Sequence, residues 1–410
     1  MLGMQGMMLK ADTRAPAAAS RQAESRAAAL SAAEKIDICR GLFAYLVVVA
    51  HAMELAWVVH PDVAPRMSPA TLDLWKRTVG TGGYWVMGFF VLSGYCIQLS
   101  VGRLRAAGRF PLRYYLAARL SRILPLYYLA LLFVVWTERL IAWDRPGYWP
   151  NGINGSVLIA QFLGLQGLTQ TYGSFAPSWS ITNELFYYLI YGLLVCLPLG
   201  KPDRPAWLGV ALCVAVAGAM QAVYALGLRT PWVLAVGLLF GLGLNWFLGA
   251  LVALHLEALR GSRAIRMLAR AWPLGLVLAA CLRFDEHIQG LVLPCGLAFG
   301  LLLVRFGPCE EAGPATATWR SSLARLLGLS SYPTYLFHGP VLMLAAAILM
   351  RWDLARDWRV TWGMLAASGI IAGLVLGVVA EAPLMTWRAY WLRRWKSGLR
   401  PSPVLVTPHR

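Results

Sequence analysis

Two polar residues that could take part in chemistry interrupt an apolar stretch near the N-terminus. The stretch CRGLFAYLVVVAHAMEL, residues 39–55, carries Arg40 and His51, eleven positions apart. On a helix that spacing is about 16 Å and brings both side chains to within about 20° of one face. A guanidinium binds anions such as phosphate, and an imidazole can take a proton near neutral pH. We expect both residues to line one polar groove that opens toward the cytoplasm, because polar groups in hydrocarbon need a partner or water; a neutral His51 bonded to a neighbouring helix carbonyl is the alternative.

Further ionisable residues lie in apolar surroundings along the rest of the chain. Arg119 and Arg122, in AARLSRILP, are one helical turn apart. Such a pair suits phosphate, and membrane anchoring by snorkelling of the two side chains is the alternative. Three more ionisable residues lie in SWSITNELFYYLIY, SSYPTYLFHGPVL and GVVAEAPLMTW, namely Glu184, His338 and Glu381. One such residue could be a satisfied helix contact, but this number of them favours a functional site.

The elements that must position these residues are apolar helices. Of the 410 residues, 59% are hydrophobic and only 14% are charged, whereas a soluble protein has about 25% charged residues. Apolar runs of about 20 residues recur along the chain, long enough to cross about 30 Å of hydrocarbon. The sequence therefore predicts an all-α, polytopic transmembrane helical bundle. Ten spans are expected, at 38–59, 83–100, 123–142, 180–198, 207–226, 231–251, 271–284, 288–305, 330–350 and 361–382.

The charge distribution predicts the topology. The net charge is +18, and basic residues cluster in short connections at 102–113, 260–270 and 388–400. With ten crossings and both termini cytoplasmic, these connections all lie on the cytoplasmic face, as the positive-inside rule requires. This pattern favours a lipid bilayer as partner and argues against nucleic acid. The Ala- and Arg-rich composition favours a multi-pass protein of a bacterial inner (plasma) membrane.

Three segments are expected. Residues 1–35 are predicted to form a flexible cytoplasmic arm, 36–385 the transmembrane domain and 386–410 a basic cytoplasmic tail.

The seven cysteines form no Cys/His cluster, so we expect no metal site. Residues 157–168 are too short to span and are expected to lie in the interface or to dip back into the bundle. Gly369, Gly373 and Gly377 are expected to let helices pack closely.

Six of these stretches resemble motifs of the acyltransferase 3 family of integral-membrane O-acyltransferases. They follow one another in the family's order over about 345 residues. Arg40 with His51 resembles an Arg/Lys-x10-His element, and RLSRILPLYY resembles an Arg-x-x-Arg element that leads into a proline. The other similar stretches are GFFVLSGYCI, PSWSITNELFYYLIY, SSYPTYLFHGPVL and the Glu-x-Pro at 381–383.

The resemblance implies transfer of an acyl group, commonly acetyl, from a cytoplasmic coenzyme A thioester to a hydroxyl. The acceptor would be a polysaccharide, glycolipid or related glycan, or another hydroxyl compound. Acyl-coenzyme A would be a co-substrate, and no cofactor would be bound permanently. We expect the transmembrane domain to act alone. The implied roles are phosphate binding by Arg40, Arg119 and Arg122, general base or acyl carrier for His51, orientation or acceptor binding by Glu184 and Glu381, and substrate binding by Ser93, Trp179, Tyr332 and His338.

Two other classes of membrane protein share some of these features. A transporter or flippase of a lipid-linked saccharide would also have about ten spans and buried charges. Such proteins often contain two similar halves with broken helices, and the sequence has no such repeat. A polyprenyl-sugar glycosyltransferase would usually carry paired acidic residues for a divalent metal, and no such pair lies in a suitable place. No G-x-S-x-G elbow or Cys–His arrangement provides another nucleophile.

Overall fold

The computed structural model describes residues 31–108, 110–144, 154–281, 289–307 and 318–398. The predicted arm up to residue 30, the tail beyond residue 398, and the RFDEH connection at 283–287 lie outside these residues. The described part contains helices and no strands. The elements are α2 (Ala32–Val59), α3 (Val63–Arg66), α4 (Pro69–Thr78), α5 (Gly82–Ala106), α6 (Leu112–Asp144), α7 (Gly155–Phe162), η1 (Ala176–Ser178), α8 (Trp179–Cys196), α9 (Arg204–Ala225), α10 (Pro231–Gly261), α11 (Arg263–Arg270), α12 (Trp272–Cys281), α13 (Gln289–Phe306), α14 (Trp319–Arg351), α15 (Trp358–Leu376), η2 (Gly377–Glu381) and α16 (Ala382–Gly398).

Local sequence signals explain where the main helices begin. Ser31 and Glu34 form a capping box at the start of α2, with the Ser31 amide 2.6 Å from the Glu34 carboxylate and the Glu34 amide 3.3 Å from Ser31 Oγ. The carboxylate of Asp357 accepts from the amides of Arg359 and Val360 and so caps α15. These caps satisfy backbone N–H groups that the first turn of a helix leaves without partners.

The predicted helical bundle is confirmed, whereas the count of ten spans stays a prediction. Each of the ten predicted segments coincides with a helix, in order α2, α5, α6, α8, α9, α10, α12, α13, α14 and α15. Seven helices among the described residues are long and apolar enough to cross a membrane, and eight if the pair α11–α12, bent by 59°, counts as one span. The helix α8 does not meet that test, and α13 contributes only a shorter apolar helix, Pro294–Phe306. The location of both termini also stays a prediction.

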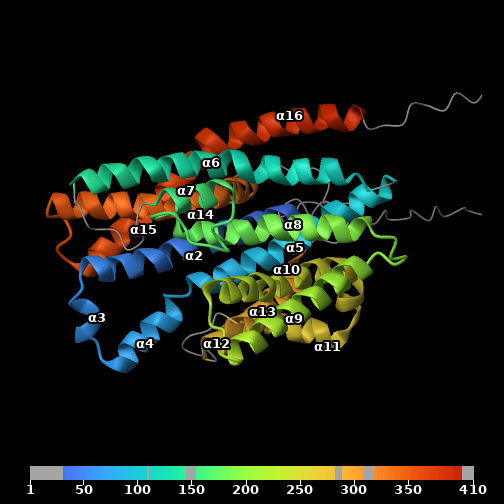
Figure 1. Ribbon diagram of the computed structural model, residues 1–410, viewed down its shortest axis with the longest axis horizontal. Coiled ribbons are helices and arrows are strands. Elements are labelled where there is room, and N and C mark those ends of the chain that lie inside the picture. The colour runs from blue at the N-terminus through green and yellow to red at the C-terminus, as the bar shows by residue number, and fades with distance from the viewer. Residues whose placement is uncertain (1–30, 109, 145–153, 282–288, 308–317, 399–410) are drawn as a thin grey trace, which may run out of the picture.

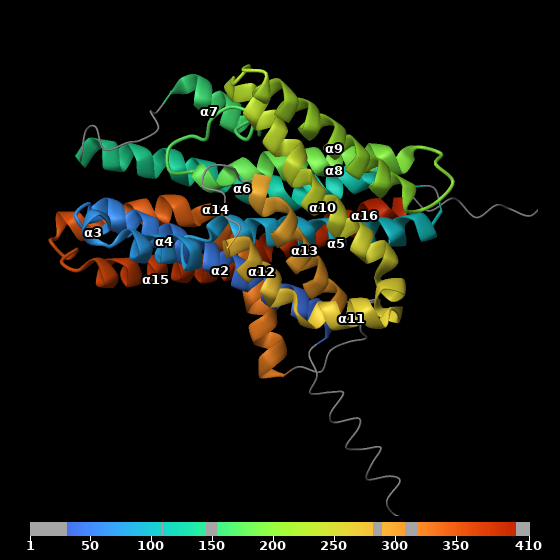
Figure 2. The same cartoon turned by 90° about the horizontal axis from the view of Figure 1, so that it is seen from below.

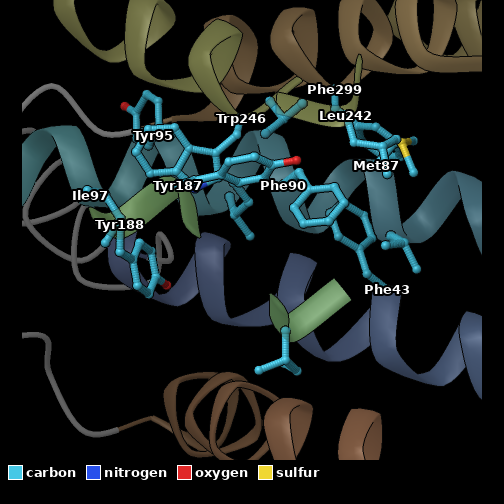
Figure 3. Packing of buried hydrophobic residues seen from close by; sticks show 14 of the residues in the cluster. Phe43, Met87, Phe90, Tyr95, Ile97, Tyr187, Tyr188, Leu242, Trp246 and Phe299 are labelled. Atoms are coloured by element: carbon cyan, nitrogen blue, oxygen red, sulfur yellow. The ribbon is translucent and has the colours of Figure 1, made fainter. Parts of the chain in front are cut away.

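The long helices form two groups that meet along α5. In Figure 1, α6 and α16 lie above α2, α14 and α15, while α9 to α13 lie below; Figure 2 shows α2, α14 and α15 side by side. The helix α5 packs against α2 on one side and α10 on the other. Aromatic side chains fill the junction with α10, among them Phe90, Tyr187 and Trp246 (Figure 3). The helix α5 therefore joins the two groups.

The connection after α6 folds back onto the bundle. Its helix α7 begins at the cap Asn154 and is followed by turns rather than by a span. Gln161 is fully buried; its amide donates to Tyr127 Oη at 2.7 Å and Ser178 Oγ at 2.9 Å, and its carbonyl accepts from the Tyr172 amide at 3.0 Å. These bonds attach the connection to α6 and to the start of α8, and thereby fix where α8 enters the bundle.

Glycines allow the closest helix contacts. A Cβ placed on Gly94 of α5 would lie 1.8 Å from the Trp246 carbonyl oxygen, and one on Gly249 of α10 would lie 1.9 Å from the Val91 carbonyl oxygen. The backbones of α5 and α10 therefore touch, which no larger residue permits. The predicted glycine stripe, on α15 and at the start of η2, is confirmed as a packing surface, since Cβ atoms at its three positions would collide with Val48, Thr334 and the Ser330 backbone.

We expect Gly94→Ala to destabilise the protein by about 1–3 kcal/mol, because the added methyl group must push two backbones apart. The matched control is Gly102→Ala on the same helix, where a Cβ meets nothing within 4 Å. That variant should be neutral or slightly more stable, since alanine favours helix by up to about 1 kcal/mol. Thermal unfolding in detergent measures both; equal melting temperatures would contradict the predicted backbone contact.

Candidate active site

One cavity gathers most of the predicted site residues. It has a volume of about 320 Å³ and is enclosed by α2, α5, α6, α8, α14 and α16. Its charged lining consists of four arginines and one glutamate, and the rest of the lining is mainly apolar or aromatic. We call it the arginine pocket. Its charged residues are Arg40, Arg119, Arg122, Glu184 and Arg388.

Each arginine of the pocket is held by a different element. Arg122 pairs with the carboxylate of Glu381 and lies 5.1 Å from the ring centroid of Tyr332. Arg119 donates to Ser100 Oγ at 2.7 Å, and Arg388 donates to the Ala118 carbonyl at 2.7 Å. Arg40 is 4.0 Å from the partly exposed carboxylate of Asp37. The guanidinium groups of Arg119, Arg388 and Arg122 are therefore preorganised by contacts with α5, α6 and η2.

Three polar atoms behind the arginine pocket have no hydrogen-bond partner among the described residues. They are Nε of Arg119, Nε of Arg388 and Oε2 of Glu381, and all three are buried. Buried polar atoms are normally paired, either with protein groups or with ordered water. Two of the three are guanidinium donors, which matches an anionic group.

A π-helical turn brings Glu381 and Arg388 to this place. The segment η2 widens the helix between α15 and α16, and Gly377 at its start packs against Ser330 of α14. Wider turns of this kind are frequent at functional sites, because they rotate the residues that follow. Glu381 ends η2 with only 1% of its surface exposed, and Arg388 follows seven residues later, about two helical turns further along α16.

A second polar cluster lies in the wall of the arginine pocket. Ser93 donates to the Glu184 carboxylate at 2.7 Å, and Tyr188 donates to the same oxygen. Trp246 donates through Nε1 to Ser93 Oγ at 3.2 Å. Glu184 is thus a carboxylate of the pocket wall with two hydroxyl partners.

The two predicted histidines form a pair of their own. His51 Nδ1 and His338 Nε2 are 3.0 Å apart, although 287 residues separate them in the chain. His338 is buried and its Nδ1 lies 3.1 Å and 2.9 Å from the carbonyl oxygens of Thr334 and Tyr335. His51 is partly exposed, and its Nε2 faces Gly82, where an added Cβ would lie 3.4 Å away.

The structure differs from the single groove expected for Arg40 and His51. Arg40 lines the arginine pocket, whereas neither histidine does. The pocket follows α5 from Ile97 to Val86, and His51 faces the next turn of that helix, at Gly82. Aromatic rings close the end between them: the Phe89 and Tyr335 centroids are 5.6 Å apart, and those of Tyr335 and His338 are 6.0 Å apart.

Most other predicted site residues also meet at the arginine pocket. Ser93, Tyr332, Arg119, Arg122 and Glu184 line it, and Glu381 lies directly behind Arg122. Trp179 does not line it; its ring lies 6.3 Å from that of Phe90.

Sequence reasoning missed Arg388, Tyr188 and Tyr335. Arg388 lies seven positions after Glu381, which places both residues on one helix face. This spacing could have identified Arg388, but the residue lies in the predicted tail. Among the described residues, no group of three or more His, Cys, Asp or Glu side chains could hold a metal ion.

Comparison with known proteins identifies the family. No curated protein and no solved structure is similar enough to this chain to count as a match. The model of the acyltransferase 3 family, described as an acyltransferase domain, matches residues 34–382, which include every pocket residue except Arg388. Since that match covers most of the chain and the helices are those of a multi-pass membrane protein, the chain belongs to the acyltransferase 3 family and is a membrane acyltransferase.

Proposed function

We propose that this acyltransferase moves an acyl group, most simply acetyl, from a cytoplasmic acyl-coenzyme A to a hydroxyl of a polysaccharide, glycolipid or related glycan. The observation that carries the proposal is the arginine pocket, in which four guanidinium groups converge on one largely apolar cavity. Coenzyme A combines several phosphate charges with a long flexible arm, and guanidinium groups are the side chains best suited to such phosphates.

The pocket has a charged part and an apolar part that match these two parts of the donor. Arg119 and Arg388 line the pocket, so their guanidinium groups can donate to phosphate oxygens. Apolar side chains of α5 and α8, including Val86, Phe89 and Ile181, suit the arm and the acyl group. We therefore assign the arginines to the phosphates and the stretch along α5 to the acyl arm.

His51 would act on the reacting atoms beyond the Phe89–Tyr335 end of the pocket. As a general base it would take the proton of the acceptor hydroxyl while that oxygen attacks the thioester carbonyl. As an acyl carrier it would itself attack the carbonyl and pass the acyl group on. Both routes break the acyl–sulfur bond, form an acyl–oxygen bond and leave a thiol. Both also require the thioester to reach past the two rings.

The carboxylates support the site in other ways than by orienting the imidazole. Glu381 would hold Arg122 in place, since its carboxylate pairs with that guanidinium. Glu184 is bonded to Ser93 and Tyr188, and these hydroxyls are available to the acyl arm or to an acceptor. Trp179 stays a predicted substrate contact. Family membership favours acyl transfer over transport of a lipid-linked saccharide; uptake without consumption of acyl-coenzyme A would favour the transporter.

We expect Arg119→Ala to raise KM for acetyl-coenzyme A about 10-fold and to leave kcat nearly unchanged, because a charge-assisted phosphate bond contributes about 1.5–3 kcal/mol. The measurement is acetyl transfer by the purified protein at two salt concentrations. Salt screens charge interactions, so the difference in KM between wild type and variant should be smaller at high salt. Arg113→Ala is the matched control, since Arg113 is exposed on the same helix and lies outside the pocket lining. An unchanged KM in Arg119→Ala would contradict the phosphate role.

A further inference from the structure

We propose that His338 is a positioning residue, which holds His51 in the tautomer that leaves Nε2 unprotonated. This role rests on the proposed acyl transfer by His51 and concerns the protonation of that imidazole before any substrate binds.

The surroundings of His338 fix its own proton. Nδ1 of His338 faces the carbonyl oxygens of Thr334 and Tyr335, at 3.1 Å and 2.9 Å. Carbonyl oxygens only accept hydrogen bonds, so Nδ1 carries the hydrogen and donates. The His338 side chain is 1% exposed and has no carboxylate among its hydrogen-bond partners, and a buried, unpaired imidazolium would be unfavourable. His338 is therefore neutral, and its Nε2 is an acceptor.

The geometry between the two rings makes His51 the donor. The ring planes are inclined by only 7°, and the centroids are 5.1 Å apart while the bonded nitrogens are 3.0 Å apart. The centroids are thus 2.1 Å further apart (5.1 minus 3.0) than the bonded nitrogens. That difference is close to the sum of the two centroid-to-nitrogen distances, as expected when two rings meet edge to edge in one plane. The bond thus lies along the lone pair of His338 Nε2. Since that atom accepts, Nδ1 of His51 must carry the hydrogen.

The remaining nitrogen of His51 is the one that can react. A neutral imidazole has one hydrogen, so Nε2 of His51 is bare once Nδ1 is protonated. No described residue donates a hydrogen bond to this atom, and it faces Gly82, which has no side chain. A free imidazole in water favours hydrogen on Nε2, so His338 selects the less common tautomer. The hydrogen bond made by the other ring nitrogen commonly sets the tautomer of a functional histidine.

The same pair accommodates the charge that develops during transfer. When Nε2 takes the acceptor's proton, Nδ1–H stays on His51 and donates more strongly to His338. The proton then passes from Nε2 to the departing thiolate sulfur, which restores the neutral pair. The acyl-carrier route needs the same bare Nε2, because that atom would attack the thioester carbonyl. His338 therefore serves either route.

The test compares His338→Gln with His338→Leu in purified protein. The Gln carbonyl oxygen can reach the position of Nε2 and accept from His51, whereas Leu has a similar volume and no acceptor. We expect kcat to fall about 10²-fold in the Leu variant with KM for the donor within about 2-fold of wild type, and the Gln variant to recover to within about 10-fold. Equal losses in both variants, or full activity with Leu, would overturn the proposal.

A second readout does not depend on acyl transfer. Nitrogen-15 NMR of histidine-labelled protein reports which ring nitrogen carries hydrogen, and the His51 signals are assigned by their loss in His51→Asn. We expect hydrogen on Nδ1 in wild type and in His338→Gln, and on Nε2 in His338→Leu. Hydrogen on Nε2 of His51 in the wild-type protein would overturn the proposal whether or not acyl-coenzyme A is the donor. If the Leu variant does not fold, the wild-type and Gln spectra still show which ring nitrogen of His51 carries the hydrogen, and so still test the proposal.

Discussion

His51→Ala is expected to lower kcat of acyl transfer by about 10³-fold while the affinity for acyl-coenzyme A stays within about 2-fold of wild type. The large loss follows because no other group in the proposed mechanism can take the acceptor's proton or carry the acyl group. The unchanged affinity follows because His51 does not line the arginine pocket. Acetyl transfer from radiolabelled acetyl-coenzyme A and equilibrium binding of the donor measure the two quantities separately.

A second histidine variant controls for general effects of removing an imidazole. His255 lies on α10 with 41% of its side chain exposed and is 3.8 Å from Asp203, outside the pocket and the histidine pair. His255→Ala should keep full activity. If folded His51→Ala retained more than about a tenth of the wild-type kcat, the role of this imidazole would be refuted.

Glu381→Ala is expected to destabilise the protein by about 3 kcal/mol, because it leaves the guanidinium of Arg122 without its counter-charge. Glu381 is 1% exposed and the side chain of Arg122 is 21% exposed, so water can replace little of the lost interaction. Removing both charges in Arg122→Met with Glu381→Leu should restore most of the stability, since apolar groups of similar volume can replace a buried ion pair. Melting temperatures in detergent test this cycle.

The same cycle separates stability from donor binding. The double variant should remain weak in binding acyl-coenzyme A even where its stability recovers, because the guanidinium itself is gone. Asp37→Asn is the matched control: the Arg40–Asp37 pair is 4.0 Å long with both side chains about a third exposed, and such pairs contribute about 0–1 kcal/mol. A double variant as unstable as Glu381→Ala would show that Glu381 has a different structural role.

Apolar periodicity and spacing were sufficient to predict the helices and part of the pocket. Each predicted span coincides with a helix, because runs of about 20 apolar residues leave few alternatives in a chain with 14% charged residues. Arg119 and Arg122 were grouped correctly, since residues three apart share a helix face. Arg40 joins them from α2 because all three lie near the same end of the bundle.

Contacts between helices that are distant in the chain could not be predicted from the sequence. The eleven-residue spacing placed Arg40 and His51 on one face of α2, and it could not reveal that Phe89 and Tyr335 come between the arginine pocket and His51. The His51–His338 pair joins two helices 287 positions apart, and its geometry depends on how α2 packs against α14. Nothing in the apolar pattern of residues 361–382 predicted the π-helical turn that aims Glu381 at Arg122.

The measurement that tests the central claim most directly is photoaffinity labelling with an acyl-coenzyme A whose acyl chain carries a photoreactive group. We expect the label around the Phe89–Tyr335 end of the arginine pocket, on α5 from Val86 toward Gly82 and on α14 from Tyr335 toward His338, because the thioester must reach past these two rings to meet His51. Labelling should be competed by acetyl-coenzyme A and should drop sharply in a variant that combines Arg119→Ala and Arg122→Ala, but not in Arg113→Ala. Label confined to helices outside the pocket, such as α9, or equal labelling of wild type and the double variant, would contradict the account.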